Sequence, residues 1–212
     1  IWKQYGSLKK IKKLQAEKEK ITDELEKKYM GLGPTQSEIQ RCVDKQSDHL
    51  SLKGKKGKEI GDICAKVISK WLSSVAGEKC KKITLSNNNI TSEGARALAK
   101  MIADSTHIQE IDLSGNEIEA DGMQAIEKSL SKNFTLVAFT YTKDTPLEIK
   151  KQLLINQYLQ GVRNSDGNPI IKTIFGSVAE LREAAIDKIK SANNLRCIQS
   201  ISVSDVGLDV EV

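Results

Sequence analysis

The residues of this chain that could do chemistry are its cysteines and histidines, which are few and far apart in the sequence. The 212 residues include four cysteines and two histidines: Cys42, Cys64, Cys80, Cys197, His49 and His107. None has the C-x-x-C, H-x-x-H or H-E-x-x-H spacing of metal sites, so the sequence predicts no metal and no cofactor. A cysteine–histidine nucleophile pair remains open, because the fold alone brings such residues together.

Two of the cysteines occupy apolar positions of predicted elements. Cys80 stands where a strand needs an apolar residue, and Cys64 lies on the apolar face of a predicted helix. Free cysteine commonly acts as a small core residue, and free thiols are typical of reducing compartments. We therefore expect a cytoplasmic location. No apolar run approaches the roughly 18–20 residues that span a bilayer, so we expect no membrane span.

A basic loop, Lys53-Gly-Lys-Lys-Gly-Lys58, interrupts the chain before the first clear repeat. Clusters of this kind can contact the phosphates of nucleic acid or anionic lipid. The loop has no interleaved aromatic residues, the net charge of the chain is +5, and the residue order does not match G-x-x-x-x-G-K-[ST]. We interpret the loop as a solvated linker and do not expect a nucleic-acid partner.

Two stretches of the chain match each other at an offset of 28 residues, from 83 to 111. Residues 83–90 read ITLSNNNI and residues 111–118 read IDLSGNEI, and the match continues downstream through Gly94 and Gly122. Matched apolar, Asn and Gly positions at one period predict a repeat protein with one strand and one helix in each unit.

Within each unit, alternating apolar residues predict a strand with one buried face, and helical spacing of apolar residues follows the glycine. An asparagine comes where the chain leaves each strand, and its amide can pair with backbone groups that the parallel ladder leaves free. The residues that define the repeat are Leu85, Asn88, Ile90, Leu113, Asn116 and Ile118.

These positions resemble the leucine-rich repeat, and specifically its long, helix-containing ribonuclease-inhibitor type. The resemblance rests on the phrases LSNNNI and LSGNEI, each followed four residues later by glycine, and it covers roughly residues 60–160. It implies an α/β fold in which a short leucine-rich-repeat solenoid, with parallel strands and outer helices, follows an α-helical hairpin. It also implies a module that binds proteins rather than an enzyme.

The sequence divides into three parts: residues 1–53 as an N-terminal helical hairpin or cap, 54–161 as the repeat core, and 162–212 as degenerate repeats or a C-terminal αβ cap. The hairpin consists of a charged helix over 7–30 and a second helix from Thr35 to about Leu50. The core adds an amphipathic helix over 60–75 and a third strand at Phe139 and Tyr141.

Side chains between the buried strand residues should face outward and line the concave side of the repeats. We predict that they bind a protein partner; the alternative is that they are merely solvated polar positions. The predicted contact residues are Lys81, Lys82, Thr84, Ser86, Gln109, Glu110, Asp112, Ser114, Thr140 and Thr142.

The resemblance leaves other functions open. Similar repeats occur in actin pointed-end caps of the tropomodulin kind and in effectors of intracellular bacteria. The many isoleucines and lysines favour an effector that binds a host protein in the host cytosol, with a cytoskeletal regulator as the alternative. Cys42-Val43-Asp44 has the C-x-D form found at the catalytic cysteine of bacterial E3 ligases with leucine-rich repeats, but here it precedes the repeats.

Overall fold

The computed structural model of the chain describes residues 10, 12–22, 24, 34–56, 59–142, 145–160 and 173–191. Its strands form one parallel sheet in the order β1-β2-β3-β4. The strands are β1 (His49–Ser51), β2 (Lys82–Thr84), β3 (Glu110–Asp112) and β4 (Ala138–Thr140). The helices that follow them are α3 (Gly61–Leu72), α4 (Ser92–Asp104), α5 (Ala120–Leu130) and α6 (Leu147–Leu159). The predicted α/β class with parallel strands is thereby confirmed.

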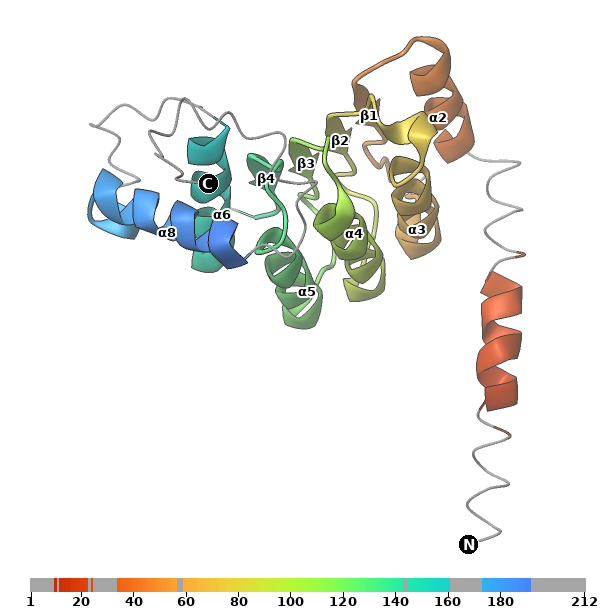
Figure 1. The fold of residues 1–212 in the computed structure, drawn as a ribbon. Helices are drawn as coiled ribbons and strands as arrows, with labels where there is room; N and C mark the ends of the chain where they lie inside the picture. Colours follow the sequence, from red (N-terminus) through yellow and green to blue (C-terminus); the bar gives the residue numbers. More distant parts are fainter. Residues whose placement is uncertain are drawn as a thin grey trace, which may run out of the picture.

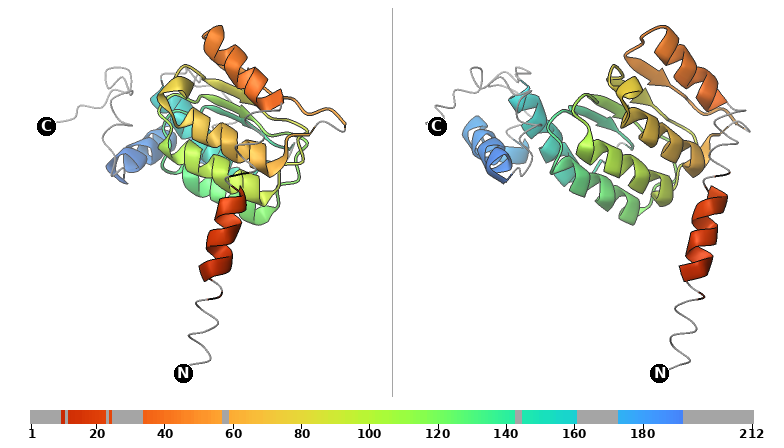
Figure 2. Two further views of the ribbon diagram at one scale, coloured as in Figure 1. Left: turned by 90° about the vertical axis from the view of Figure 1, so that its right-hand side faces the viewer. Right: turned by 45° about the vertical axis from the view of Figure 1, so that its right-hand side comes forward.

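The strands and helices form two layers. Figure 1 shows β1 to β4 side by side, with α3, α4 and α5 aligned along the same face of the sheet. Figure 2 shows this arrangement from two further directions. Parallel strands must be joined by a crossover, and the helix of each unit provides it. The opposite face of β2 and β3 is left for the polar side chains of the strands.

The central residue of each strand points toward the helices. Leu50 pairs with Ile83, Ile83 with Ile111 and Ile111 with Phe139, and all four side chains are at most 8% exposed. An apolar row therefore runs across the sheet under the helices, as the alternating pattern of the repeats predicts.

The first strand, β1, was not predicted. The sequence pattern predicts a helix from Thr35 to about Leu50, but helix α2 (Pro34–Asp44) ends six residues earlier and Leu50 belongs to β1. Since Leu50 pairs with Ile83 and is fully buried, the amphipathic helix α3 completes a unit that begins at β1. The strand lies within residues 1–53, and the predicted division into three parts remains a prediction.

The end of α2 has a local cause in the turn that follows it. Gln46 adopts a φ of 48°, in the left-handed region that ends helices. The Gln46 N–H donates to the Val43 carbonyl at 3.2 Å, and the Ser47 N–H donates to the Cys42 carbonyl at 2.9 Å. These two bonds form a Schellman motif, which turns the chain into β1.

The N-terminal segment is helical where it is described. Residues 12–22 form a helix on which Leu14 and Ile21 are 56% and 53% exposed. This helix lies apart from α2 in both figures. The connection between the two helices falls outside the described residues, so the predicted hairpin remains a prediction.

Glycines allow the close approach of neighbouring units. A Cβ atom on Gly122 of α5 would lie 2.8 Å from the Ser92 Cα and 2.7 Å from the Ile118 Cγ2, and one on Gly94 would lie 2.7 Å from the Ile90 Cγ2. Real Cβ atoms do not come so close, so α5 can pack against the start of α4 because residue 122 has no side chain.

Helix α8 (Val178–Ser191) packs against α6 at the far end of the sheet. A second apolar cluster lies between them, made of Phe134, Leu154, Ile155, Leu159, Leu181 and Ala185. A short 3₁₀ helix, η1 (Val75–Gly77), connects α3 to β2. Most of the predicted degenerate repeats or αβ cap, residues 162–172 and 192–212, lies outside the described residues.

Candidate functional site

Two asparagines fix the ends of the strands. The Asn88 Nδ2 donates to the Leu52 carbonyl at 2.6 Å and to the Ser86 carbonyl at 3.2 Å, and its Oδ1 accepts the Ile60 N–H at 3.3 Å. Asn88 is fully buried. Its amide therefore pairs backbone groups of its own unit with those of the preceding unit, which confirms the predicted role.

Asn116 repeats this pattern one unit later. Its Nδ2 donates to the Leu85 carbonyl at 2.9 Å and to the Leu113 carbonyl at 2.8 Å. Its Oδ1 accepts the N–H groups of Asn88 at 2.9 Å and Ile90 at 3.1 Å. The same side chain thus joins two successive units at equivalent places, and the relative position of their strands is fixed.

The opposite ends of the strands are joined by a repeated backbone pattern. The Asp48 carbonyl accepts the N–H groups of Lys81 and Lys82, at 2.7 and 2.9 Å. The Lys81 carbonyl accepts those of Gln109 and Glu110, and the Gln109 carbonyl accepts those of Val137 and Ala138. Because both strand ends are bonded in this way, the side chains of the outer face have fixed spacing.

We call this outer face the strand face, defined by the outward side chains of β1 to β4 and of the residues directly beside them. In register, one row consists of His49, Lys82, Glu110 and Ala138, and a second row of Ser51, Thr84, Asp112 and Thr140. Five of the ten predicted contact residues stand in these two rows with exposed or half-buried side chains: Lys82, Thr84, Glu110, Asp112 and Thr140. Four more lie just before or after the strands and are also exposed or half-buried: Lys81, Gln109, Ser114 and Thr142.

The tenth residue, Ser86, was predicted wrongly as a surface contact. Its side chain is 3% exposed, and its carbonyl accepts the Gly54 N–H at 2.7 Å. Strand β2 ends at Thr84, so the alternation of inward and outward side chains no longer holds two residues further on. Ser86 belongs to the turn that Asn88 holds, and we exclude it from the strand face.

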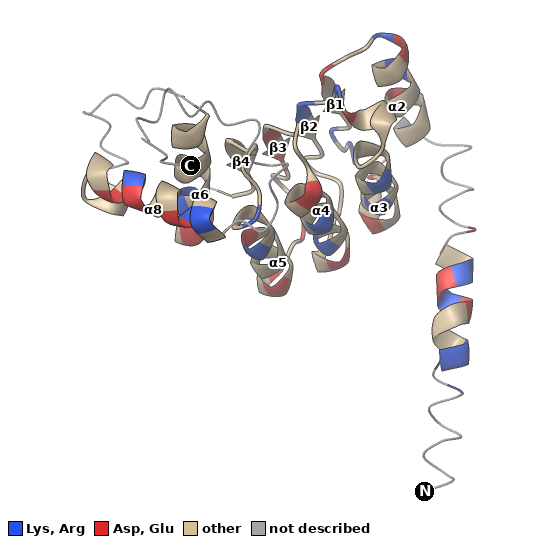
Figure 3. Cartoon of the chain, in the orientation of Figure 1, with Lys and Arg blue, Asp and Glu red and all other residues tan. Residues whose placement is uncertain are grey.

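Charge is unevenly distributed over the strand face. Figure 3 shows basic residues at β2, acidic residues at β3 and uncharged residues at β4. The Lys82 Nζ lies 2.7 Å from the Glu110 Oε2, and both side chains are 48% exposed. The hydrogen bond to Glu110, together with its charge, raises the pKa of Lys82 above its ordinary value. These two opposite charges therefore hold each other in place.

Sequence reasoning missed His49, which takes the first place in the row of Lys82. Its Nε2 lies 2.9 Å from the Thr84 Oγ1. The available signal was the spacing of Leu50 and Leu52, which matches that of Ile83 and Leu85. The spacing from 50 to 83 is 33 residues instead of 28, so a search at one fixed period does not find it.

Cys42 does not form a catalytic pair with the His49 ring. Cys42 is 3% exposed, its Sγ donates to the His49 backbone carbonyl at 3.3 Å, and the His49 ring contacts Thr84 instead. Burial raises the pKa of Cys42, and burial likewise raises the pKa of Cys80 to about 11. An activated thiolate needs a lowered pKa and an exposed position, so Cys42 has neither property of a nucleophile.

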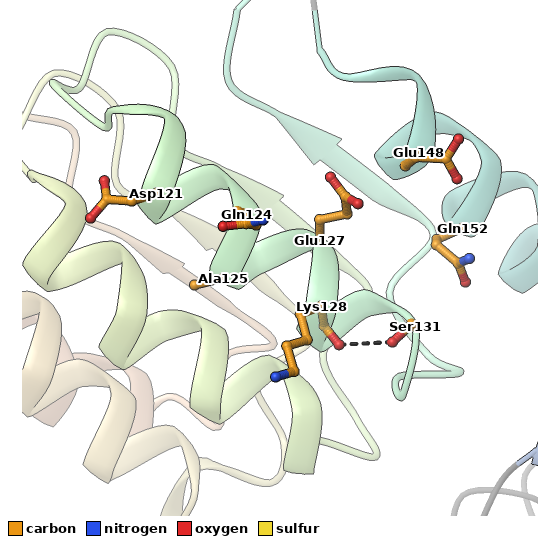
Figure 4. A pocket seen from close by; sticks show the side chains of 8 residues that line it. All are labelled: Asp121, Gln124, Ala125, Glu127, Lys128, Ser131, Glu148 and Gln152. Carbon is orange, nitrogen blue, oxygen red and sulfur yellow. Dashed lines mark hydrogen bonds between the residues drawn. The ribbon is translucent and has the colours of Figure 1, made fainter.

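The helix side of the molecule contains a groove of about 630 Å³ between α5 and α6. Figure 4 shows the carboxylates of Asp121, Glu127 and Glu148 around it. Two of them already have cationic partners, because Asp121 pairs with Arg96 and Glu148 with Lys151. The residues that line the groove include no histidine or cysteine.

In the described part of the chain, no three or more His, Cys, Asp and Glu side chains are grouped so that they could hold a metal ion. No helix among the described residues combines the length and the apolar character that crossing a membrane requires.

The family model described as Leucine Rich repeat matches residues 81–99 and 104–126. These ranges contain β2 with most of α4 and β3 with most of α5, together with both asparagine positions. No curated protein matches the chain. The match and the repeated asparagine bonds agree, and residues 81–99 and 104–126 of this protein are similar to leucine-rich repeats.

Proposed function

We propose that this protein is a non-catalytic interaction module that binds a protein partner through the strand face and the helices that flank the repeats. Leucine-rich repeats generally mediate protein–protein interaction, and the observation that carries the proposal is the pair of in-register rows across β1 to β4. Parallel strands hold side chains about 4.8 Å apart. Because both ends of the strands are bonded to their neighbours, little ordering entropy is lost on binding.

The charge distribution indicates which kind of surface the strand face would accept. Lys81 and Lys82 lie beside Glu110 and Asp112, whereas Ala138 and Thr140 of β4 are exposed and uncharged. A partner surface with charges of both signs at one end and small side chains at the other would match it. Complementary charges of this kind set orientation and association rate more than affinity.

The proposal is tested by measuring how tightly charge-reversed variants bind the protein partner. Wild-type protein is used to isolate a partner from cytosolic extract, and the dissociation constant of the purified pair is then measured for Lys82→Glu, Glu110→Lys and Asp112→Lys. We expect losses of about tenfold or more for at least one reversal. Lys100→Glu, an exposed change on α4, is the matched control and should bind like the wild type. Unchanged binding by all three reversals would reject the strand face as the site.

We make two finer proposals, on the type of repeat and on the location of the protein. The 28-residue period with a helix in each unit supports the ribonuclease-inhibitor type of repeat.

The buried thiols Cys42, Cys64 and Cys80 are free, which supports a cytoplasmic location or, for a secreted effector, the host cytosol. Labelling of the protein in infected or transfected cells, followed by fractionation, tests the location independently of the binding assay.

A cytoskeletal role is a second candidate because a long helix, α8, packs on the last described unit of a short repeat array. Actin pointed-end caps of the tropomodulin kind have a few repeats and a terminal helix. An assay of actin elongation at pointed ends, with filaments whose barbed ends are capped, tests this role. Inhibition by wild-type protein would favour this role, and normal elongation at saturating protein would exclude it.

A further inference from the structure

A buried lysine attaches α8 to the rest of the molecule. Lys188 is 7% exposed. Its Nζ donates to the Leu130 carbonyl at 2.9 Å and to the Asn156 Oδ1 at 2.8 Å, and it lies 5.1 Å from the centre of the Phe134 ring. One side chain of α8 thus contacts the end of α5, the turn after it, and α6.

Both oxygen atoms that accept hydrogen bonds from Lys188 are held in place by groups other than Lys188. The Leu130 carbonyl is at the end of α5, where the last carbonyls of a helix have no partner within the helix. Asn156 is fully buried and donates its Nδ2 to the Leu136 carbonyl at 2.8 Å. This bond sets the orientation of the amide, so the Oδ1 faces Lys188.

The site is built from neutral groups. The other titratable and charged side chains of the surrounding elements are Asp121, Glu127 and Lys128 of α5, Lys132 of the turn, Glu148, Lys150, Lys151 and Tyr158 of α6, and Glu180, Arg182, Glu183, Asp187 and Lys190 of α8. Among the described residues none of them is ion-paired with Lys188, and burial is the cause that lowers the pKa of Lys188 to about 7. A neutral Lys188 amine has two N–H groups, which match the Leu130 carbonyl oxygen and the Asn156 Oδ1. The third N–H group of an ammonium would have only the Phe134 ring as its acceptor.

We propose that α8 is a proton-controlled latch, which docks on α6 and the end of α5 with Lys188 as the neutral amine and is loosened when Lys188 takes up a proton. On docking, the ammonium of the free helix gives one proton to solvent. On release, Lys188 takes that proton back and α8 uncovers the apolar side chains that Leu181 and Ala185 cover: Phe134, Leu154, Ile155 and Leu159. This device is separate from the strand face and does not depend on the proposed function.

The direction of the pH effect follows from the two protonation states. An exposed lysine has a pKa of about 10.4, and the docked Lys188 has a pKa of about 7. Between these values the free helix binds one more proton than the docked helix, so docking strengthens as pH rises. Below about pH 7 both states are protonated, and docking is weakest and independent of pH for this group.

Amide hydrogen exchange of the whole chain tests the latch. Protection factors of α8, corrected for intrinsic exchange, should rise with pH above 7 by up to about tenfold per pH unit in the wild type. The rise should be absent in Lys188→Met and retained in Lys190→Met, a matched change at an exposed position of the same helix. Amides of α4 provide the internal reference. A wild-type rise equal to that of α4, or a rise that persists in Lys188→Met, overturns the proposal.

A second measurement covers the case in which Lys188→Met leaves α8 unfolded. The ¹³Cε resonance of Lys188 in the wild type reports its protonation directly while contacts of Leu181 with α6 report docking. A titration near pH 7 in the docked helix supports the latch. A titration near the ordinary lysine value of about 10.4 with α8 still docked refutes it.

Discussion

The backbone N–H of Asn88 donates to the side-chain Oδ1 of Asn116 at 2.9 Å, so the residue that fixes one turn is itself fixed by its equivalent in the next. The two residues are 28 positions apart, the period of the repeat. The bond makes the turns of neighbouring units interdependent. Loss of one asparagine should therefore affect the stability of two units.

Asn88→Ala should lower the free energy of unfolding by about 2–4 kcal/mol, because the Leu52 carbonyl and the Ile60 N–H lose the Asn88 side chain as their partner and the Ser86 carbonyl keeps only the Gly54 N–H. Urea denaturation followed by circular dichroism measures the change. Asn89→Gly is the control, since Asn89 is exposed and has a φ of 51° that glycine accepts. Equal stability of the two variants would contradict the role of Asn88.

Gly122→Ala should destabilise the protein by about 1–3 kcal/mol, because the new methyl group has no room beside Ser92 and Ile118. The sign of the change in unfolding free energy decides between close and loose packing, because the same substitution at an open helix position would stabilise the protein by about 1 kcal/mol. Gln124→Ala, at an exposed position of the same helix, serves as the control. A higher melting temperature for Gly122→Ala would mean that α4 and α5 are not in close contact there.

Asp62→Ala should cost about 1–2 kcal/mol through loss of a helix cap. The Asp62 carboxylate, at the start of α3, accepts the Thr91 N–H at 2.8 Å, the Thr91 hydroxyl at 2.7 Å and the Gly94 N–H at 3.0 Å. It thus caps α4 from the preceding unit. Chemical denaturation compares Asp62→Ala with Asp104→Ala, an exposed change at the end of α4. The comparison distinguishes loss of the cap from loss of one negative charge. Similar values for both variants would argue against it.

The sequence predicts the part of the fold that repeats regularly. The strands β2, β3 and β4 follow from one period of 28 residues, and α3 follows from its apolar face. Strand β1 does not, because it precedes β2 by 33 residues and its three residues have no pattern of their own. Pairing with β2 decides the conformation of Leu50, and such tertiary effects outweigh local propensity.

The site is predictable to the extent that strand alternation holds. Lys82 and Glu110 lie within strands and face outward as expected, whereas Ser86 lies beyond the end of β2 and is buried. Lys188 could not be assigned from sequence, since a lysine on a surface helix is ordinarily exposed. Its burial depends on acceptors 32 and 58 residues away.

Cys42, Cys64 and Cys80 should be chemically inert in the folded protein. Burial raises the pKa of Cys42, Cys64 and Cys80, so the thiolate fraction at pH 8 is smaller than in the unfolded chain, and access is blocked as well. Iodoacetamide at pH 8, followed by peptide mass spectrometry, should modify these three residues at least about tenfold more slowly in native protein than in 6 M guanidinium. Rapid native modification of Cys42 alone would instead identify an activated thiol and revive the enzymatic alternative, which a ubiquitin-discharge assay with Cys42→Ala as the control would then decide.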